Sequence, residues 1–156
     1  MCIFILIIGC QACRNGWISF NDSCYLFART PVDWPDALAV CNAMNSHLVE
    51  IETAEEDNFI RTTLQSLQAK GSVTTDGYWI GMTDIEVNNS WRWINSDRLP
   101  SYSRWHPGQP DNRPGEDCGV LWTTFNFEWG DHFCKDNVEM FICEGENATE
   151  GGQIIG

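Results

Sequence analysis

The positions of its cysteines constrain the fold of this chain more than any other feature of the sequence. The chain opens with MCIFILIIGCQAC, and the apolar run at residues 3–8 is too short to span a bilayer. Such a run followed by small residues is typical of a secretory signal peptide. We therefore expect residues 1–12 to be a signal peptide and the mature chain to begin near Cys13, secreted into an extracellular, oxidising compartment. No second apolar run of membrane length occurs, so no membrane span is expected.

The cysteines of the expected mature chain are Cys13, Cys24, Cys41, Cys118, Cys134 and Cys143. An even number of cysteines in a secreted chain predicts a disulfide framework, but spacing alone leaves many pairings open. No two of these cysteines form a CxxC pair, which argues against metal ligation by cysteine.

The chain is strongly acidic, with 9 basic and 22 acidic residues and a net charge of −13. This charge would repel phosphate backbones, so nucleic acid is not an expected partner. It suits a calcium-rich extracellular setting in which carboxylates are ligands, although acidity also simply keeps a protein soluble.

Local patterns predict strands and two helices in the first half of the chain. Alternating apolar residues at 13–25 favour a short hairpin. Asp33 is a suitable N-cap for a helix that would place Cys41 on its buried face. Thr53 and Glu56 form a capping box at the start of a second helix.

Short strand-like runs are spread along the chain, mostly in its second half. They are HLVEI, YWIGMTD, SWRWI, GVLWTTF and FICE. Stretches rich in Gly, Pro, Asn and Asp separate the later runs. Strands and two helices followed by strands and long loops predict an α+β fold. The Gly-rich segment at residues 146–156 is expected to be a flexible tail.

Eight motifs follow one another along the chain: GW..F..SCY (16–25), the helix with Cys41, WIGM (79–82), W.W (91–93), QPD (109–111), EDC (116–118), W.D (129–131) and FICE (141–144). In this order they resemble the C-type lectin domain, in its long form with an extra N-terminal hairpin. The resemblance covers about residues 13–145 and implies two helices packed on small antiparallel sheets, long calcium-binding loops and three disulfides. The implied disulfides are Cys13–Cys24, Cys41–Cys143 and Cys118–Cys134. Trp79 and Met82 would then be packing residues.

The stretch GQPDNRPGEDCG at residues 108–119 carries more oxygen ligands per residue than any other part of the chain. Calcium takes about six to eight oxygen ligands. The calcium ligands that the resemblance implies are Gln109, Asp111, Glu116 and Asp131. In the family, sugar hydroxyls complete the coordination shell and hydrogen-bond to the same residues, and the bond before the QPD proline is typically cis. The QPD motif goes with galactose-type sugars, so the resemblance implies galactose or N-acetylgalactosamine as the ligand.

Gly130 departs from the family pattern, which has Asn at this position of the W.D motif. The Asn side chain gives an oxygen to the ion and an amide donor to the sugar, and Gly130 gives neither. Water replaces a neutral metal ligand more easily than a directional donor, so we expect sugar affinity to suffer more than calcium affinity. Asn126 is the side chain that could compensate.

Arg113 stands where galactose-binding members often have a Trp that stacks on the sugar. The aromatic group could come instead from Trp105, Trp122 or Trp129, of which Trp129 fits the core better. Arg113 itself is either a solvated loop charge or a fork that binds carboxylate or sulfate on an acidic glycan.

A second, structural calcium site occurs in part of the family. The matching residues are Asp84, Asn88, Asn112 and Asp117. Two of the four are amides, so this site would be poorer in charge. Glycosylation sequons occur at Asn21, Asn88 and Asn147.

These features together predict a secreted, single-domain lectin of invertebrate type that binds glycans through calcium, in glycan or microbial recognition of the innate immune kind. No GxSxG, HExxH or phosphate-binding glycine loop occurs, so an enzyme is not expected. Two alternatives on the same fold stay open: a calcium-independent protein-interaction module, and a mineral- or matrix-binding protein. A homo-oligomer would raise avidity for a multivalent glycan.

Overall fold

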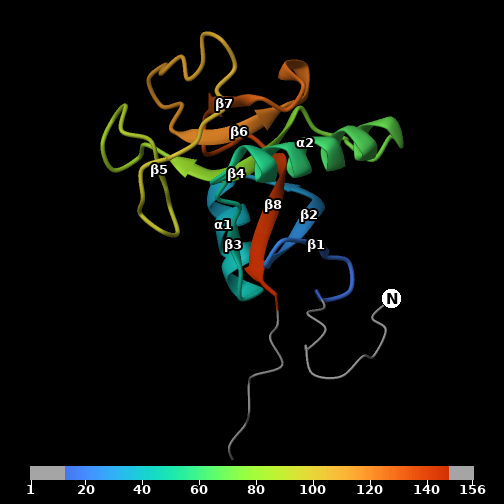
Figure 1. Ribbon diagram of the computed structural model, residues 1–156. Coiled ribbons are helices and arrows are strands. Elements are labelled where there is room, and N and C mark those ends of the chain that lie inside the picture. Colours follow the sequence, from blue (N-terminus) through green and yellow to red (C-terminus); the bar gives the residue numbers. More distant parts are fainter. Residues whose placement is uncertain (1–12, 148–156) are drawn as a thin grey trace, which may run out of the picture.

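The computed structural model describes residues 13–147 (Figure 1). The predicted signal peptide at residues 1–12 lies outside this range, as does most of the predicted tail. The last strand runs to Glu146, so the first residue of the predicted tail still belongs to the folded domain.

The N-terminal hairpin forms as expected and leads directly into the first helix. Strand β1 (Ile18–Phe20) pairs antiparallel with β2 (Ser23–Val32). Helix α1 (Trp34–Ala43) begins after Asp33, whose carboxylate accepts a 3.0 Å hydrogen bond from the backbone N–H of Asp36. This cap fixes the first turn, and Cys41 then lies fully buried on the inner face.

Helix α2 (Ala54–Ala69) also begins at its predicted cap. Thr53 Oγ1 accepts a 3.1 Å hydrogen bond from the backbone N–H of Glu56. The Glu56 carboxylate reaches back one residue further than a capping box predicts, because it accepts from the N–H of Glu52 at 2.7 Å. Ile60 and Leu64 of this helix are fully buried.

The remaining strands are β3 (His47–Leu48), β4 (Gly77–Thr83), β5 (Arg92–Trp93), β6 (Cys118–Trp122), β7 (Trp129–His132) and β8 (Glu139–Glu146), with a 3-10 helix at Thr123–Phe125. The strand order is β1-β2-β8-β4-β6-β7, with β3 paired to β8 and β5 paired to β4. One parallel pairing, between β4 and β8, joins antiparallel parts that were expected as separate small sheets. Strand β7 was not predicted, and β3 is shorter than its HLVEI run.

The core lies in two clusters on the two faces of this sheet system. One cluster packs Trp93 and Trp129 against Ile60 and Leu64 of α2. The other packs Trp79 beneath α1, together with Cys41 and other residues. Trp79 and Met82 are 0% exposed, which confirms that these residues of the WIGM motif pack in the core. The predicted α+β fold with two helices is therefore confirmed.

All three predicted disulfides are present: Cys13–Cys24, Cys41–Cys143 and Cys118–Cys134. The second joins α1 to β8 across 102 residues of sequence, and the third closes the segment between β6 and the end of β7. Each contributes roughly 2–4 kcal/mol, mainly by constraining the unfolded chain.

The long loops gather at one end of the molecule. Figure 1 shows the chain between β4 and β6, coloured yellow and orange, looping beyond the sheet on the side away from β1. This segment carries only the short strand β5 and an isolated bridge from Trp105 to Trp129. The QPD motif lies in it and is therefore presented beside β6 and β7.

Candidate metal centre

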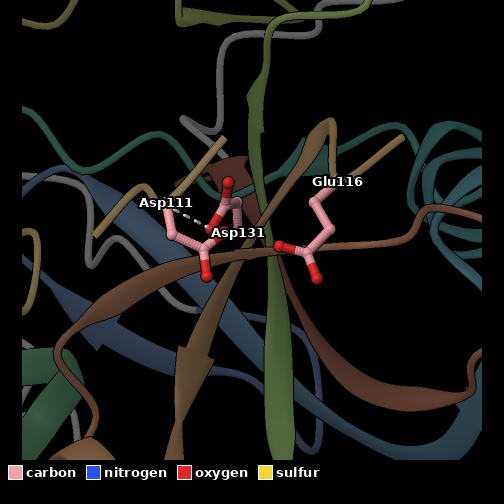
Figure 2. A group of neighbouring side chains, drawn as sticks. All are labelled: Asp111, Glu116 and Asp131. Atoms are coloured by element: carbon pink, nitrogen blue, oxygen red, sulfur yellow. Dashed lines mark hydrogen bonds between the residues drawn. The ribbon is translucent and has the colours of Figure 1, made fainter. Parts of the chain in front are cut away.

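Three carboxylates converge beside the end of strand β7. One oxygen from each of Asp111, Glu116 and Asp131 lies within 4.8 Å of the others. Figure 2 shows the Asp111 and Asp131 side chains next to each other, with the carboxylate of Glu116 directed toward them. Asp131 is on β7, Glu116 lies two residues before β6, and Asp111 follows the Gln109–Pro110 bond, which is cis as expected.

Asp131 holds the loop in place by accepting two backbone hydrogen bonds. Its Oδ1 accepts from the N–H of Asp111 at 3.2 Å, and its Oδ2 accepts from the N–H of Asn112 at 2.9 Å. Gln109 closes the arrangement from the other side, because its Oε1 accepts from the N–H of Asp131 at 3.5 Å. The structure therefore brings together all four residues that were predicted as calcium ligands.

The three carboxyl groups of the cluster alter one another's pKa values. Burial, together with the charges of Asp111 and Asp131, raises the pKa of Glu116 to about 7. Burial also raises the pKa of Asp131, whereas a hydrogen bond with the Glu116 side chain lowers the pKa of Asp111. These shifts indicate that the three carboxylates do not readily ionise together at such close range. A divalent cation among them would favour their ionised forms, and a set made of oxygen donors suits calcium.

Arg113 lies at the rim of this cluster. Its Nε atom is 3.2 Å from Asp111 Oδ2, and its side chain is 73% exposed while that of Asp111 is 29% exposed. The guanidinium is therefore paired with one predicted metal ligand and still open to solvent. Both interpretations of Arg113, as a solvated charge and as a fork for an acidic glycan, remain hypotheses.

Gly130 is adjacent to the cluster, and the space for its missing side chain is filled. A Cβ atom at this position would lie 2.5 Å from Cδ1 and 2.6 Å from Nε1 of Trp122, and 3.3 Å from Gln109 Oε1. Of the three candidate aromatic residues, Trp122 is thus the one beside the site. Trp129 is fully buried, and Trp105 packs edge-on against it with ring centroids 5.8 Å apart.

Asn126, the side chain that could compensate for Gly130, makes its contacts elsewhere. Its Oδ1 accepts a 2.9 Å hydrogen bond from Gln65, and its backbone carbonyl accepts from Arg61 at 3.2 Å. Both partners are on α2, so the Asn126 side chain is engaged by that helix rather than by the carboxylate cluster. The sequence did carry a signal for the real neighbour, since a glycine in a short strand often marks a close approach of another group.

The second predicted calcium set is only partly assembled. The N–H of Asp84 donates to the carbonyl of Asp117 at 3.2 Å. Burial raises the pKa of the Asp84 carboxyl, and a hydrogen bond and charge from the Asp117 side chain raise it further. Asn112 Oδ1 instead accepts from Trp91 Nε1 at 3.3 Å, and Asn88 is exposed. Asp84 and Asp117 thus come together, while Asn112 is tied to the core.

A further group of buried acids was missed by sequence reasoning. Glu144 on β8 accepts from the N–H of Glu50 at 3.2 Å and from the hydroxyl of Ser23 at 3.0 Å. Burial, followed by the charge of Glu56, raises the pKa of Glu144 to about 8. Acidic residues are usually read as solvent-facing, so nothing in the sequence marked the half-buried Glu144 as part of a buried group.

The sequons differ in accessibility. Asn21 and Asn88 are exposed, whereas Asn147 is only 7% exposed and its amide donates to the carbonyl of Asn21 at 3.5 Å. The first two therefore fit surface glycosylation better than Asn147 does. Across residues 13–147, no helix is both long enough and apolar enough to cross a membrane.

Comparisons with known proteins agree with this architecture. Residues 30–145 match the family model described as the lectin C-type domain. The chain is 37% identical over 131 residues to a perlucin-like protein of Mytilus galloprovincialis, covering 84% of this chain and 81% of that protein. Several other relatives are longer, and this chain spans 34–62% of their length.

Solved structures show the same likeness. The carbohydrate-recognition domain of the mouse scavenger receptor C-type lectin aligns with a TM-score of 0.74 and 36% identity, covering 88% of this chain and 98% of that chain. SPL-1, in its complex with GlcNAc, aligns with a TM-score of 0.78 and 31% identity, covering 89% and 99%. These likenesses confirm the fold expected from the sequence resemblance.

Proposed function

The chain belongs to the C-type lectin domain family, and from this premise we propose that it is a secreted lectin that binds galactose-type sugars through calcium. The family is one of binding domains without enzymatic activity. The observation that carries the proposal is the convergence of Gln109, Asp111, Glu116 and Asp131 at one point. Their oxygen donors and surplus negative charge are typical of a calcium-binding loop rather than of a surface loop without a ligand.

Each residue of the cluster has a definite part in this proposal. The three carboxylates and the Gln109 amide oxygen would hold the ion, and Asp131 keeps the loop turned toward β7 through its two backbone hydrogen bonds. When bound, calcium supplies open coordination positions for a pair of neighbouring sugar hydroxyls. The carboxylates that surround it can then accept hydrogen bonds from those hydroxyls, and the Gln109 amide group can donate one.

The sugar class is inferred from the order of amide and carboxylate in QPD. Gln109 precedes the cis bond and Asp111 follows it, which in the family goes with galactose-type ligands. The complex of the related SPL-1 with GlcNAc supports a sugar as the ligand class without deciding which sugar this chain prefers.

A glycan array probed with calcium and with a chelator tests the proposal. We expect binding to galactose and N-acetylgalactosamine glycans that disappears with the chelator, and we expect Asp111→Ala to lose it by at least about tenfold, because a ligand charge is removed. Glu55→Ala, an exposed acid on α2, is the control for the loss of one charge. Binding that is insensitive to both chelator and Asp111→Ala would contradict the lectin function.

That contrary result would favour a calcium-independent interaction module, and Gly130 is the observation that supports it. The position lacks the side chain that would give a further oxygen to the ion. A mineral- or matrix-binding role would instead depend on the net charge of −13 and not on the loop. Adsorption to carbonate surfaces that survives Asp111→Ala would identify this second alternative.

A further inference from the structure

Trp122 fills the space that a side chain at position 130 would occupy. The Cβ of any residue other than glycine there would lie 2.5 Å and 2.6 Å from two atoms of the indole, closer than real Cβ contacts allow. The same point is 3.3 Å from Oε1 of Gln109. The pyrrole edge of the indole, which carries Nε1, therefore lies beside a residue of the candidate metal centre.

The indole is held there from several sides. On β4, Gly77 leaves room for the other ring, since a Cβ on Gly77 would lie 3.3 Å from Cε3 of Trp122. The ring of His132 packs edge-on to the indole with centroids 4.8 Å apart, and His132 stacks in turn on the buried Trp79 at 5.6 Å. Two glycines and one aromatic stack thus fix the position of the ring.

The indole N–H is free to bind a ligand. Within residues 13–147 Nε1 of Trp122 has no protein acceptor, and it is not among the buried polar atoms that lack a partner. It therefore keeps some exposure to solvent, although Trp122 as a whole is half-buried. Indole is a donor only, so it can donate to a sugar oxygen but gives no oxygen to a cation. It differs in this respect from a side-chain amide, which does both.

We propose that Trp122 is the sugar-contacting residue that replaces the side chain absent at Gly130. Its N–H donates to the oxygen of a sugar hydroxyl bound beside Gln109, and its ring edge packs on the neighbouring C–H groups of that sugar. This inference rests on the proposed lectin function. It narrows the ligand to a pyranose whose coordinated hydroxyl adjoins an apolar C–H face, as in galactose-type sugars. In such a site the carboxylates hold the ion, whereas Trp122 selects the sugar.

Two measurements on Trp122→Phe distinguish sugar recognition from calcium binding. This substitution keeps an aromatic ring and removes the N–H. We expect its affinity for galactose, titrated in saturating calcium, to fall about three- to tenfold, the value of one neutral hydrogen bond. Calcium affinity should not change. Trp122→Ala should lose more sugar affinity because the ring contact is also lost. Trp17→Phe is the matched control, because this half-buried Trp lies just before β1, away from the site.

Substitutions at Gly130 test the position of the ring independently of any ligand. In the metal-free protein, Gly130→Asn should lower the Tm, because the new Cβ meets the indole. Combining Gly130→Asn with Trp122→Val should restore the Tm and increase calcium affinity, since an amide oxygen is added where the indole stood.

The outcomes distinguish this inference from the proposed function. Sugar affinity of Trp122→Phe equal to wild type, or a parallel loss of calcium, would overturn the role of Trp122 while the lectin function stands. Gly130→Asn as stable as wild type would also overturn it. A wild-type protein without chelator-sensitive sugar binding would overturn the lectin function, and the inference with it.

Discussion

At the level of single residues, Arg113 forms an ion pair with Asp111 at the edge of the carboxylate cluster. A hydrogen bond with Glu116 is the main cause that lowers the pKa of the Asp111 carboxyl, and the charge of the Arg113 guanidinium lowers it further. A bound cation would neutralise Asp111, and Arg113 would then be freer to pair with an anion on the ligand. Because the guanidinium is exposed, an anion on the ligand can reach it, but the ion pair would contribute only a small binding free energy.

Arg113→Ala should therefore weaken sulfated or sialylated galactosides more than neutral ones, by about two- to fivefold, because an exposed ion pair is worth up to about 1 kcal/mol. The check is a competition titration with matched neutral and sulfated ligands. Arg98→Ala is the control, since Arg98 is also exposed and pairs with Glu52. Equal losses for neutral and acidic ligands would show that Arg113 only supports the loop.

At the level of elements, the sequence predicted those features, such as the starts of the helices, that depend on interactions between residues close together in the chain. Asp33 and Thr53 cap the two helices as their sequence positions indicate, and the disulfides follow from the resemblance. Strand β7 was missed because its residues, Trp129–His132, become a strand only by pairing with β6. The same holds for the site. Its candidate metal ligands could be named from sequence motifs. The contact of the Trp122 indole with Gly130 joins two strands, and the glycine itself was its only signal in the sequence.

Helix α2 is tied to β7 through one buried carboxylate. Asp57 is 0% exposed, accepts a 2.9 Å hydrogen bond from Trp129 Nε1 and lies 3.5 Å from Arg104. Asp57→Ala leaves the indole N–H without a partner and should lower the free energy of unfolding by about 1–3 kcal/mol. Asp57→Asn keeps an acceptor and should cost less.

Urea unfolding of both variants beside wild type measures this difference. Glu55→Ala serves as the control, because Glu55 is an exposed acid in the first turn of the same helix. A loss for Asp57→Asn as large as for Asp57→Ala would mean that the ion pair with Arg104, rather than the bond to Trp129, carries the connection.

At the level of the whole molecule, acid should act in opposite directions on the fold and on ligand binding. Without a cation, the pKa of Glu116 is about 7 and that of Glu144 about 8, both raised chiefly by burial. A carboxyl whose pKa is raised by folding stabilises the folded state while it is protonated, below its unfolded pKa of about 4.5. That stabilisation is lost as the pH rises through the folded pKa. Calcium, in contrast, binds the deprotonated cluster, so its affinity falls on acidification.

We therefore expect the Tm of the metal-free protein to fall by a few degrees between about pH 5 and pH 8. Glu144→Gln should flatten that slope, because the amide stays neutral at every pH. As the pH is lowered from about 8, the calcium-loaded protein should progressively release galactose from an affinity column, with release complete at about pH 4. Differential scanning calorimetry and stepwise elution measure the two effects. Sugar retained at that pH, or release that coincides with unfolding of the domain, would contradict a cation held by the carboxylates of Asp111, Glu116 and Asp131.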